Sequence, residues 1–174
     1  GVPSEVVRQA TSKAGAIVDY EVTTARDDRD GQAPVSCVPA SGTSFAPGLS
    51  VVTCRASDRS GNTASVSFPV RVTYGAPTDG TFFLQPINPD GSSVFRAGLL
   101  FPLPVRFRLS GASSAIGDLD VRLHMRRVSD TVSIRVNEPW QLGLADAGNR
   151  FRFNHRTRHY ELNVGTHHVP TGIR

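Results

Sequence analysis

The chain has 174 residues, of which 39% are hydrophobic and 20% charged, a composition that fits a globular protein. Its length allows one large core or two small ones, and we expect two domains. No apolar run approaches the ~18 to 20 residues of a membrane-spanning helix, so we expect no membrane span. The formal net charge is +4, and residues 75–174 carry the whole excess, with twelve arginines against eight acidic residues. Because Lys13 is the only lysine, this arginine preference fits a GC-rich coding sequence as well as a binding need.

The first half of the chain alternates apolar and polar residues with a period of two, as half-buried β-strands do. The alternation occurs in residues 18–22, 52–56 and 64–72. Turn-forming pairs such as Asp30-Gly31 and Ser60-Gly61 separate these segments. The pattern predicts antiparallel strands with one buried and one solvated face.

The two cysteines, Cys37 and Cys54, fall on two different predicted strands and not in a Cys-x-x-Cys spacing. A disulfide is therefore favoured over two free core thiols. Cys54 shares the apolar face of its strand with Val52 and Ala56, so we expect the bridge to be buried. Closing this loop would stabilise the fold by about 3 kcal/mol in the chain-entropy account. An oxidising, extracytoplasmic compartment follows from such a bridge.

Spaced motifs in residues 34–48 and 52–62 agree with one another, and they include Ser36-Cys37-Val38-Pro39 and Asp58-Arg59-Ser60-Gly61-Asn62. Together they resemble the hyalin repeat (HYR) domain over about residues 2–73. The resemblance implies an immunoglobulin-like β-sandwich of an extracellular protein, with a role in display or adhesion. We therefore expect one such sandwich in residues 1–74, followed by a short linker at 75–79, where glycine and proline end the preceding strand.

In residues 80–174 the period of two returns, and no window keeps a helical period. Strands are predicted at residues 105–109, 119–125, 132–136, 149–153 and 160–164. The pair Ala97-Gly98 and the run Pro104-Val105-Arg106-Phe107 resemble the motifs of PxKF domains, with Arg106 where the family has lysine. The resemblance implies a module appended to secreted bacterial proteins and enzymes. The whole chain is thus expected to be all-β, with two tandem immunoglobulin-like antiparallel β-sandwiches.

Both ends of the chain suggest a piece of a longer protein. It begins at Gly1 without a basic and apolar leader, so we expect the export signal to lie elsewhere. PxKF-like domains continue past a pair such as Thr171-Gly172, so we expect the second domain to lack its last strand or strands. Truncation, cleavage after Arg174, or a strand supplied by another chain would each account for this.

Two acidic loops are candidates for a calcium site, since Ca²⁺ takes six to eight oxygen ligands. The alternative is that these side chains close their own turns, and Arg29 and Arg59 in the same loops would oppose a cation. The candidate ligands are Asp27, Asp30, Asp58 and Asn62.

A basic strand face in the second half is a candidate site for anionic polymers, because its arginines alternate with apolar residues. Acidic polysaccharide or cell-wall polymer is the expected partner, and nucleic acid is not, because exposed aromatic residues for base stacking are missing from the pattern. The alternative is a solvated face neutralised by neighbouring acidic residues. The arginines are Arg106, Arg108, Arg122, Arg126, Arg135, Arg150 and Arg152. Trp140 and Tyr160 are candidate sugar-stacking platforms, with core packing as the alternative.

Metal-dependent or nucleophilic catalysis is not indicated. His155 and His159 would lie ~13 Å apart on one strand unless a tight turn joins them, and the adjacent His167 and His168 would point to opposite faces, so these are expected to be surface histidines rather than zinc ligands. Gly-x-Ser-x-Gly and His-Glu-x-x-His motifs are absent from the sequence. Carboxylates such as Asp118 and Asp120, or Glu138 near Asp146, form pairs of a kind that any β protein contains.

We therefore predict a noncatalytic extracellular adhesion, spacer or substrate-targeting module of a secreted or cell-surface protein of bacterial type. The alternative is an accessory domain pair of a larger secreted hydrolase, which would serve folding and positioning only.

Overall fold

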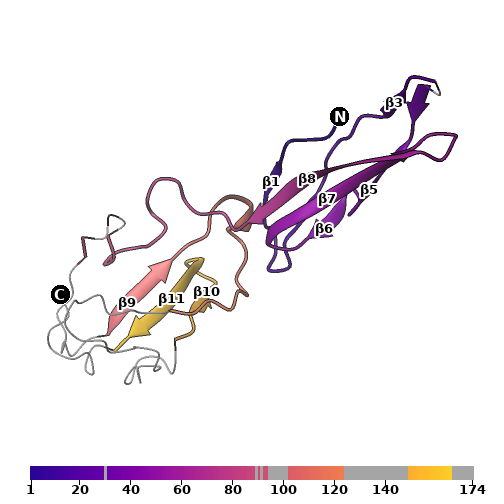
Figure 1. Cartoon of the computed structure of the whole chain (residues 1–174). Coiled ribbons are helices and arrows are strands. Elements are labelled where there is room, and N and C mark those ends of the chain that lie inside the picture. The colour runs from indigo at the N-terminus through magenta and orange to yellow at the C-terminus, as the bar shows by residue number, and fades with distance from the viewer. Residues whose placement is uncertain (30, 89, 91, 94–101, 124–148, 166–174) are drawn as a thin grey trace, which may run out of the picture. The chain divides into compact units, whose positions relative to one another are not determined.

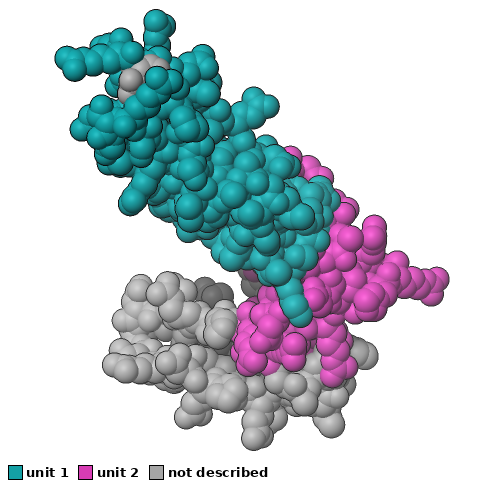
Figure 2. Space-filling model, turned by 90° about the vertical axis from the view of Figure 1, so that its right-hand side faces the viewer, with its two compact units in different colours: residues 1–75, 111–113 teal, residues 76–110, 114–174 magenta. Residues whose placement is uncertain are grey.

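The structure is a computed structural model, and it describes residues 1–29, 31–88, 90, 92–93, 102–123 and 149–165. Within these residues the regular elements are β-strands, apart from one 3₁₀ turn, so the prediction of an all-β chain is confirmed. The chain divides into two compact units (Figure 2). Unit 1 comprises residues 1–75 and 111–113, and unit 2 comprises residues 76–110 and 114–174.

Unit 1 is built from a four-stranded sheet and two strand pairs (Figure 1). The sheet has the order β1-β8-β7-β5, in which β1 runs parallel to β8 and the other neighbours are antiparallel. The pairs are β2–β6 and β3–β4, both antiparallel. The described strands are β1 (Val6–Gln9), β2 (Ala16–Val18), β3 (Ala25–Asp27), β4 (Gly31–Ala33), β5 (Val35–Val38), β6 (Thr43–Phe45), β7 (Gly48–Ser57) and β8 (Thr63–Thr73).

The long hairpin of β7 and β8 shows the predicted alternation of buried and exposed side chains. Val52 lies opposite Phe68 and both are buried, whereas the side chain of Val51, one residue earlier, is 58% exposed. The expected strands at residues 52–56 and 64–72 are thus confirmed. Further buried side chains come from the β2–β6 pair, namely Ala16, Val18 and Phe45. Apolar side chains from both the large sheet and the small pair therefore form the interior of unit 1.

The strand expected at residues 18–22 is wrong in its extent, because β2 ends at Val18. Tyr20 is still buried, but its backbone leaves the sheet. The hydroxyl of Ser41 accepts a hydrogen bond from the Tyr20 N–H at 2.9 Å and donates one to the Tyr20 carbonyl at 2.8 Å. A side chain has therefore taken the place of a neighbouring strand in satisfying this backbone.

Gly15 is required at the entry to β2. Its φ is +119°, a region that residues with a Cβ rarely adopt. A Cβ at this position would also lie 1.8 Å from the carbonyl oxygen of Phe45, on the partner strand β6. The close approach of the two backbones thus depends on the absence of a side chain at Gly15.

Unit 2 contains a three-stranded antiparallel sheet with the order β10-β11-β9. Its strands are β9 (Leu103–Phe107), β10 (Arg152–Asn154) and β11 (His159–Val164), and the 3₁₀ turn η1 (Gly111–Ser113) follows β9 in sequence. Residues 82–84 lie along the free edge of β9, where the N–H of Leu84 donates to the carbonyl of Arg106 at 2.9 Å. Residues 121–123 and 149–151 pair through the N–H of Leu123 and the carbonyl of Asn149 at 2.8 Å.

An aromatic cluster fills the core of unit 2. The rings of Phe107 and Tyr160 stack with centroids 4.9 Å apart, and Phe151 contacts Phe107 edge-on at 5.1 Å. Phe82 stacks on the same Phe107 ring at 5.2 Å. The strand predicted at residues 160–164 is confirmed as β11, and the strand predicted at residues 105–109 is present as β9 but ends at Phe107. The strand predicted at residues 149–153 is shorter than expected, because β10 begins at Arg152. In the strand predicted at residues 119–125, the described residues form only an isolated bridge, between Arg122 and Arg150. Residues 97–98 and the predicted strand at residues 132–136 lie outside the described residues.

The turn η1 belongs to unit 1, although it follows β9 in sequence. The side chain of Ser113 is fully buried, and its hydroxyl donates to the carbonyl of Ala10 at 2.6 Å and accepts from the N–H of Gly75 at 3.0 Å. The N–H of Ala112 donates to Oε1 of Gln9 at 2.8 Å. Residues 111–113 carry neither a motif nor an apolar period, so this return to unit 1 could not be predicted from the sequence.

Candidate functional site

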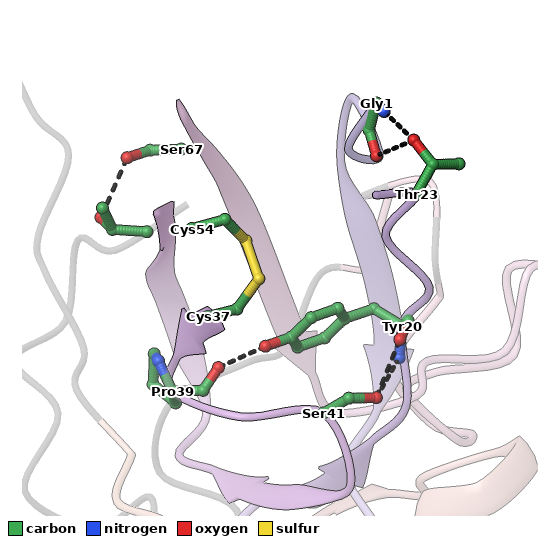
Figure 3. Close-up of a disulfide and its surroundings, with 9 residues drawn as sticks. Gly1, Tyr20, Thr23, Cys37, Pro39, Ser41, Cys54 and Ser67 are labelled. Carbon is green, nitrogen blue, oxygen red and sulfur yellow. Dashed lines mark hydrogen bonds between the residues drawn. A yellow bond between two sulfur atoms is a disulfide. The ribbon is translucent and has the colours of Figure 1, made fainter. Parts of the chain in front are cut away.

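The predicted disulfide between Cys37 and Cys54 is confirmed (Figure 3). The two residues lie directly opposite each other on neighbouring strands β5 and β7, with their Cα atoms 4.0 Å apart. Cys54 is 1% exposed and faces the core, as its position beside Val52 predicted. Because both strands belong to one sheet, the bridge ties β5, at the edge of this sheet, to the central hairpin.

Tyr20 lies beside the bridge, and its hydroxyl donates a hydrogen bond to the carbonyl of Pro39 (Figure 3). Its ring contacts Phe68 edge-on, with centroids 5.1 Å apart. Burial raises the pKa of the Tyr20 hydroxyl above its usual 10.0, because the charged phenolate would lose its hydration. This arrangement serves the fold, and nothing about it indicates catalysis.

Two of the candidate calcium ligands, Asp58 and Asp27, use carboxylate oxygens within their own turns. Asp58 accepts hydrogen bonds from the N–H and the side-chain amide of Asn62, both at 2.7 Å. The hydrogen bond from the side-chain amide of Asn62 is the largest cause of the lowered pKa of Asp58. Asp27 accepts from the N–H of Arg29 at 2.8 Å, and Asp30 lies outside the described residues. Within the part of the chain that is described, no three His, Cys, Asp or Glu residues form a group suited to a metal ion, and the calcium site stays a prediction.

Two arginines of the expected basic face, Arg106 and Arg152, are separated by a carboxylate across the sheet. Arg106 on β9 and Arg152 on β10 both lie opposite Glu161 of β11, which places the three residues on one face of the sheet. Arg106 also donates to the carbonyl of Gln85 at 2.8 Å. The charge of this row is therefore mixed.

The other described arginines of the predicted face also have acidic neighbours. Arg108 donates to the hydroxyl of Thr81 at 2.6 Å and lies 3.8 Å from Asp79. Asp120 pairs with Arg122 at 3.3 Å and with Arg150 at 3.0 Å. Arg126 and Arg135 lie outside the described residues. These acidic neighbours favour the alternative of a solvated face for the described positions, and the binding of an anionic polymer stays a prediction.

The turn between β10 and β11 carries two further arginines, Arg156 and Arg158, that the sequence-based site did not include. Both are exposed. The signal was present in the sequence, because residues 150–159 contain four arginines and two histidines. The predicted face rests on arginines that alternate with apolar residues, and residues 155–159 contain no apolar residue. The tight turn does bring His155 and His159 into one hairpin, but the described residues supply no third metal ligand there.

The proposed role of Tyr160 as a sugar platform is wrong. Its ring is 1% exposed and stacks within the aromatic core. Its hydroxyl donates to the carbonyl of Ile116 at 2.9 Å and accepts from the N–H of Leu119 at 3.2 Å. Alternation along β11 places Tyr160 on the apolar side with Leu162 and Val164, which favours the core alternative. Trp140 lies outside the described residues.

Of the carboxylates considered for glycoside cleavage, Asp118 and Asp120 lie within the described residues. Asp120 holds two arginines, as above, while Glu138 and Asp146 lie outside the described residues. An open groove of about 680 Å³ in unit 1 is lined by Glu5, Asp19 and Glu21 together with Arg8. Within the described residues, no helix has the length and apolarity to cross a membrane.

Residues 1–72 match the HYR domain family, which agrees with the resemblance carried by the residues around Cys37 and Cys54. The match lies entirely within unit 1. HYR domains are noncatalytic modules of extracellular and cell-surface proteins. Neither a curated protein nor a solved structure matches the chain.

Proposed function

We propose that this chain, whose first 72 residues match the HYR domain family, is a noncatalytic adhesion, spacer or substrate-targeting module of a secreted or cell-surface protein of bacterial type. Each unit would be an immunoglobulin-like β-sandwich, the second one related to PxKF domains. The proposal gives both units a role in display and binding, and none in bond breaking.

The observation that carries this proposal is the HYR match together with the bridge between Cys37 and Cys54 inside it. Disulfides persist in oxidising compartments outside the cytoplasm, so the bridge and the family support the same location. Both cysteines lie within the matched residues, so the bridge is part of the pattern that the family match describes.

The partner would be a polysaccharide or a cell-wall polymer, and anionic ones are favoured. All of the chain's net positive charge lies in residues 75–174. Excess positive charge attracts polyanions and accelerates their association. Glu161 lies opposite Arg106, and Asp120 pairs with Arg150. The attraction would therefore come from arginines that have no such acidic neighbour.

Retention of the whole chain on acidic and neutral polysaccharides and on cell-wall fragments, measured across a salt series, tests this proposal. Retention on acidic members that weakens as salt rises is expected, because exposed ion pairs are screened. Salt-resistant retention on neutral members would instead assign binding to uncharged residues such as Trp140. Release of soluble fragments from any member would contradict the noncatalytic role.

A further inference from the structure

The hairpin of β10 and β11 concentrates positive charge at one end of the unit 2 sheet. Residues 149–165 contain four arginines and two histidines, against Glu161 as the single acidic residue. Two of the arginines, Arg156 and Arg158, lie in the turn itself and are exposed. Among the described residues neither of them forms an ion pair with a carboxylate, in contrast to Arg108, Arg122 and Arg150.

The backbone of this turn is held in place by Asn154. Its side-chain oxygen accepts hydrogen bonds from the N–H groups of Arg156 at 3.0 Å and Thr157 at 3.2 Å. Its carbonyl accepts from the N–H of Arg158 at 2.7 Å. The amide of Asn154 and the hydroxyl of Thr157 both donate to Glu161 at about 3.3 Å. The turn therefore presents its arginines from a fixed backbone, which lowers the entropy lost on binding.

Arg158 occupies a backbone conformation that favours glycine. Its φ is +58°, and among the described residues it is the only one other than glycine with a positive φ. The Cβ of an L-residue is unfavourable in this region. The turn between β7 and β8 in unit 1 places Gly61 in the left-handed region, with a φ of +89°. Arg158 in the β10–β11 turn thus costs stability that glycine at this position would not cost. Such backbone outliers are found preferentially at functional positions.

Arginine at an exposed, rigid turn suits carboxylate and sulfate groups, because the planar guanidinium donates two parallel hydrogen bonds to either. We propose that the tip of the β10–β11 hairpin, centred on Arg156 and Arg158, is the contact site for an acidic polysaccharide. This inference rests on the proposed function, since it supplies the surface through which the module would be targeted.

Two other polyanions fit the hairpin less well. Phe151 and Tyr160 are buried in the core, and the half-buried Phe153 packs against Tyr160 and His155, so the hairpin offers little exposed phenyl surface for stacking on a nucleic acid base. Residues 155–158 contain no aliphatic or aromatic side chain to insert into the apolar boundary of a membrane, which peripheral membrane segments need. The disulfide also favours an extracytoplasmic compartment, where nucleic acid is scarcer than in the cytoplasm.

The test compares the whole wild-type chain with the double variant Arg156→Ser and Arg158→Gly. Binding to heparin, as a sulfated probe, and to alginate, as a carboxylated probe, is measured over a salt series. We expect the double variant to bind at least about fivefold more weakly, from the loss of two exposed charge pairs. Its melting temperature should not fall, because glycine relieves the backbone of residue 158. This opposite response of binding and stability separates a contact site from a merely structural turn.

The matched control is Arg26→Ser with Arg29→Ser, which removes the same charge from two exposed positions of unit 1. It should lower binding by less than about twofold, through net charge alone. A second variant, Arg158→Lys, keeps the charge at the strained position, and it should bind more tightly than Arg158→Gly.

Equal weakening in the double variant and its control would overturn the hairpin site but leave the module's binding role standing. Binding of neither heparin nor alginate by the wild type would also overturn the inference, whereas retention on neutral polymers would still support the proposed function. Tighter binding to double-stranded DNA or to phosphatidylglycerol vesicles than to either glycan would assign the hairpin to another class of partner.

Discussion

The two units reach an all-β fold by different chemistry. Unit 1 contains both cysteines of the chain, and its bridge joins β5 to β7. Unit 2 contains no cysteine, and its sheet packs on stacked and edge-on rings around Phe107 and Tyr160. In the described part of the chain, each of the four strands of unit 1 outside the main sheet is only three residues long, namely β2, β3, β4 and β6. Short strands bury little apolar area, so a covalent link contributes where packing is limited.

This comparison predicts that loss of the disulfide affects one unit only. The double variant Cys37→Ala with Cys54→Ala should lower the stability of unit 1 by about 2 to 5 kcal/mol, since the unfolded chain regains its freedom. Hydrogen exchange of the whole chain, followed by mass spectrometry, should show faster exchange in β7 and β8. Exchange in β9 and β11 should stay as in the wild type.

Reduction of the wild-type chain with dithiothreitol is the control for this variant, because it opens the same bridge without removing the sulfur atoms. Both treatments should give the same exchange pattern. Faster exchange in β9 and β11 as well would show that the two units unfold together, and would contradict their independence.

The buried tyrosines offer a second way to test the comparison. Tyr160→Phe removes a hydroxyl that serves both the carbonyl of Ile116 and the N–H of Leu119. We expect this change to lower the stability of unit 2 by about 2 kcal/mol, because two buried groups lose their partner. Tyr20→Phe removes one bond, to the carbonyl of Pro39, and should cost unit 1 about 1 kcal/mol.

Denaturant unfolding of both variants, with hydrogen exchange to assign each loss to its unit, checks this order. The ring remains in place in both proteins, so the aromatic packing is preserved and only hydrogen bonds differ. A larger loss from Tyr20→Phe than from Tyr160→Phe would show that the hydroxyl of Tyr20 contributes more to unit 1 than its single bond indicates.

The sequence predicted what depends on local alternation. The buried faces of β7, β8, β9 and β11 follow from their period of two, and the partnership of Cys37 and Cys54 follows from their places on two strands. HYR-type spacing predicted the family match of residues 1–72.

The sequence failed where the outcome depends on which residues meet across strands. That Glu161 would separate Arg106 from Arg152 depends on the register of three strands, and register is set by the whole sheet rather than by any one segment. The sequence left Tyr160 open between a surface platform and the core, because an aromatic residue with a polar hydroxyl suits either environment. Its partners, Ile116 and Leu119, lie more than 40 residues earlier in the chain.

A third prediction concerns Ser113, which lies in the second half of the sequence but belongs to unit 1. Ser113→Ala should lower the stability of unit 1 by about 1 to 2 kcal/mol, since the carbonyl of Ala10 and the N–H of Gly75 lose a buried partner. Hydrogen exchange should become faster in β1 and at the end of β8. The matched control is Ser114→Ala, one residue further along, which should leave both strands unchanged. Faster exchange confined to β9 would contradict the assignment of η1 to unit 1.

The smallest expected effect is a change in the stability of unit 1 at alkaline pH. Burial raises the pKa of Tyr20 in the folded state above 10.0, its value in the unfolded chain. The folded state therefore holds this proton more tightly, and the resulting stability is fully present below about pH 10 and lost as the pH rises through the folded-state pKa. Guanidinium unfolding of the wild type and of Tyr20→Phe at pH 8 and pH 11 measures this loss. The wild type should lose more stability than the variant between these pH values, because phenylalanine does not titrate. The remaining tyrosines are present in both proteins, so their titration cancels in the comparison. Equal losses in the two proteins would mean that Tyr20 ionises as readily in the fold as in the unfolded chain, and that its burial beside the disulfide does not disfavour the phenolate.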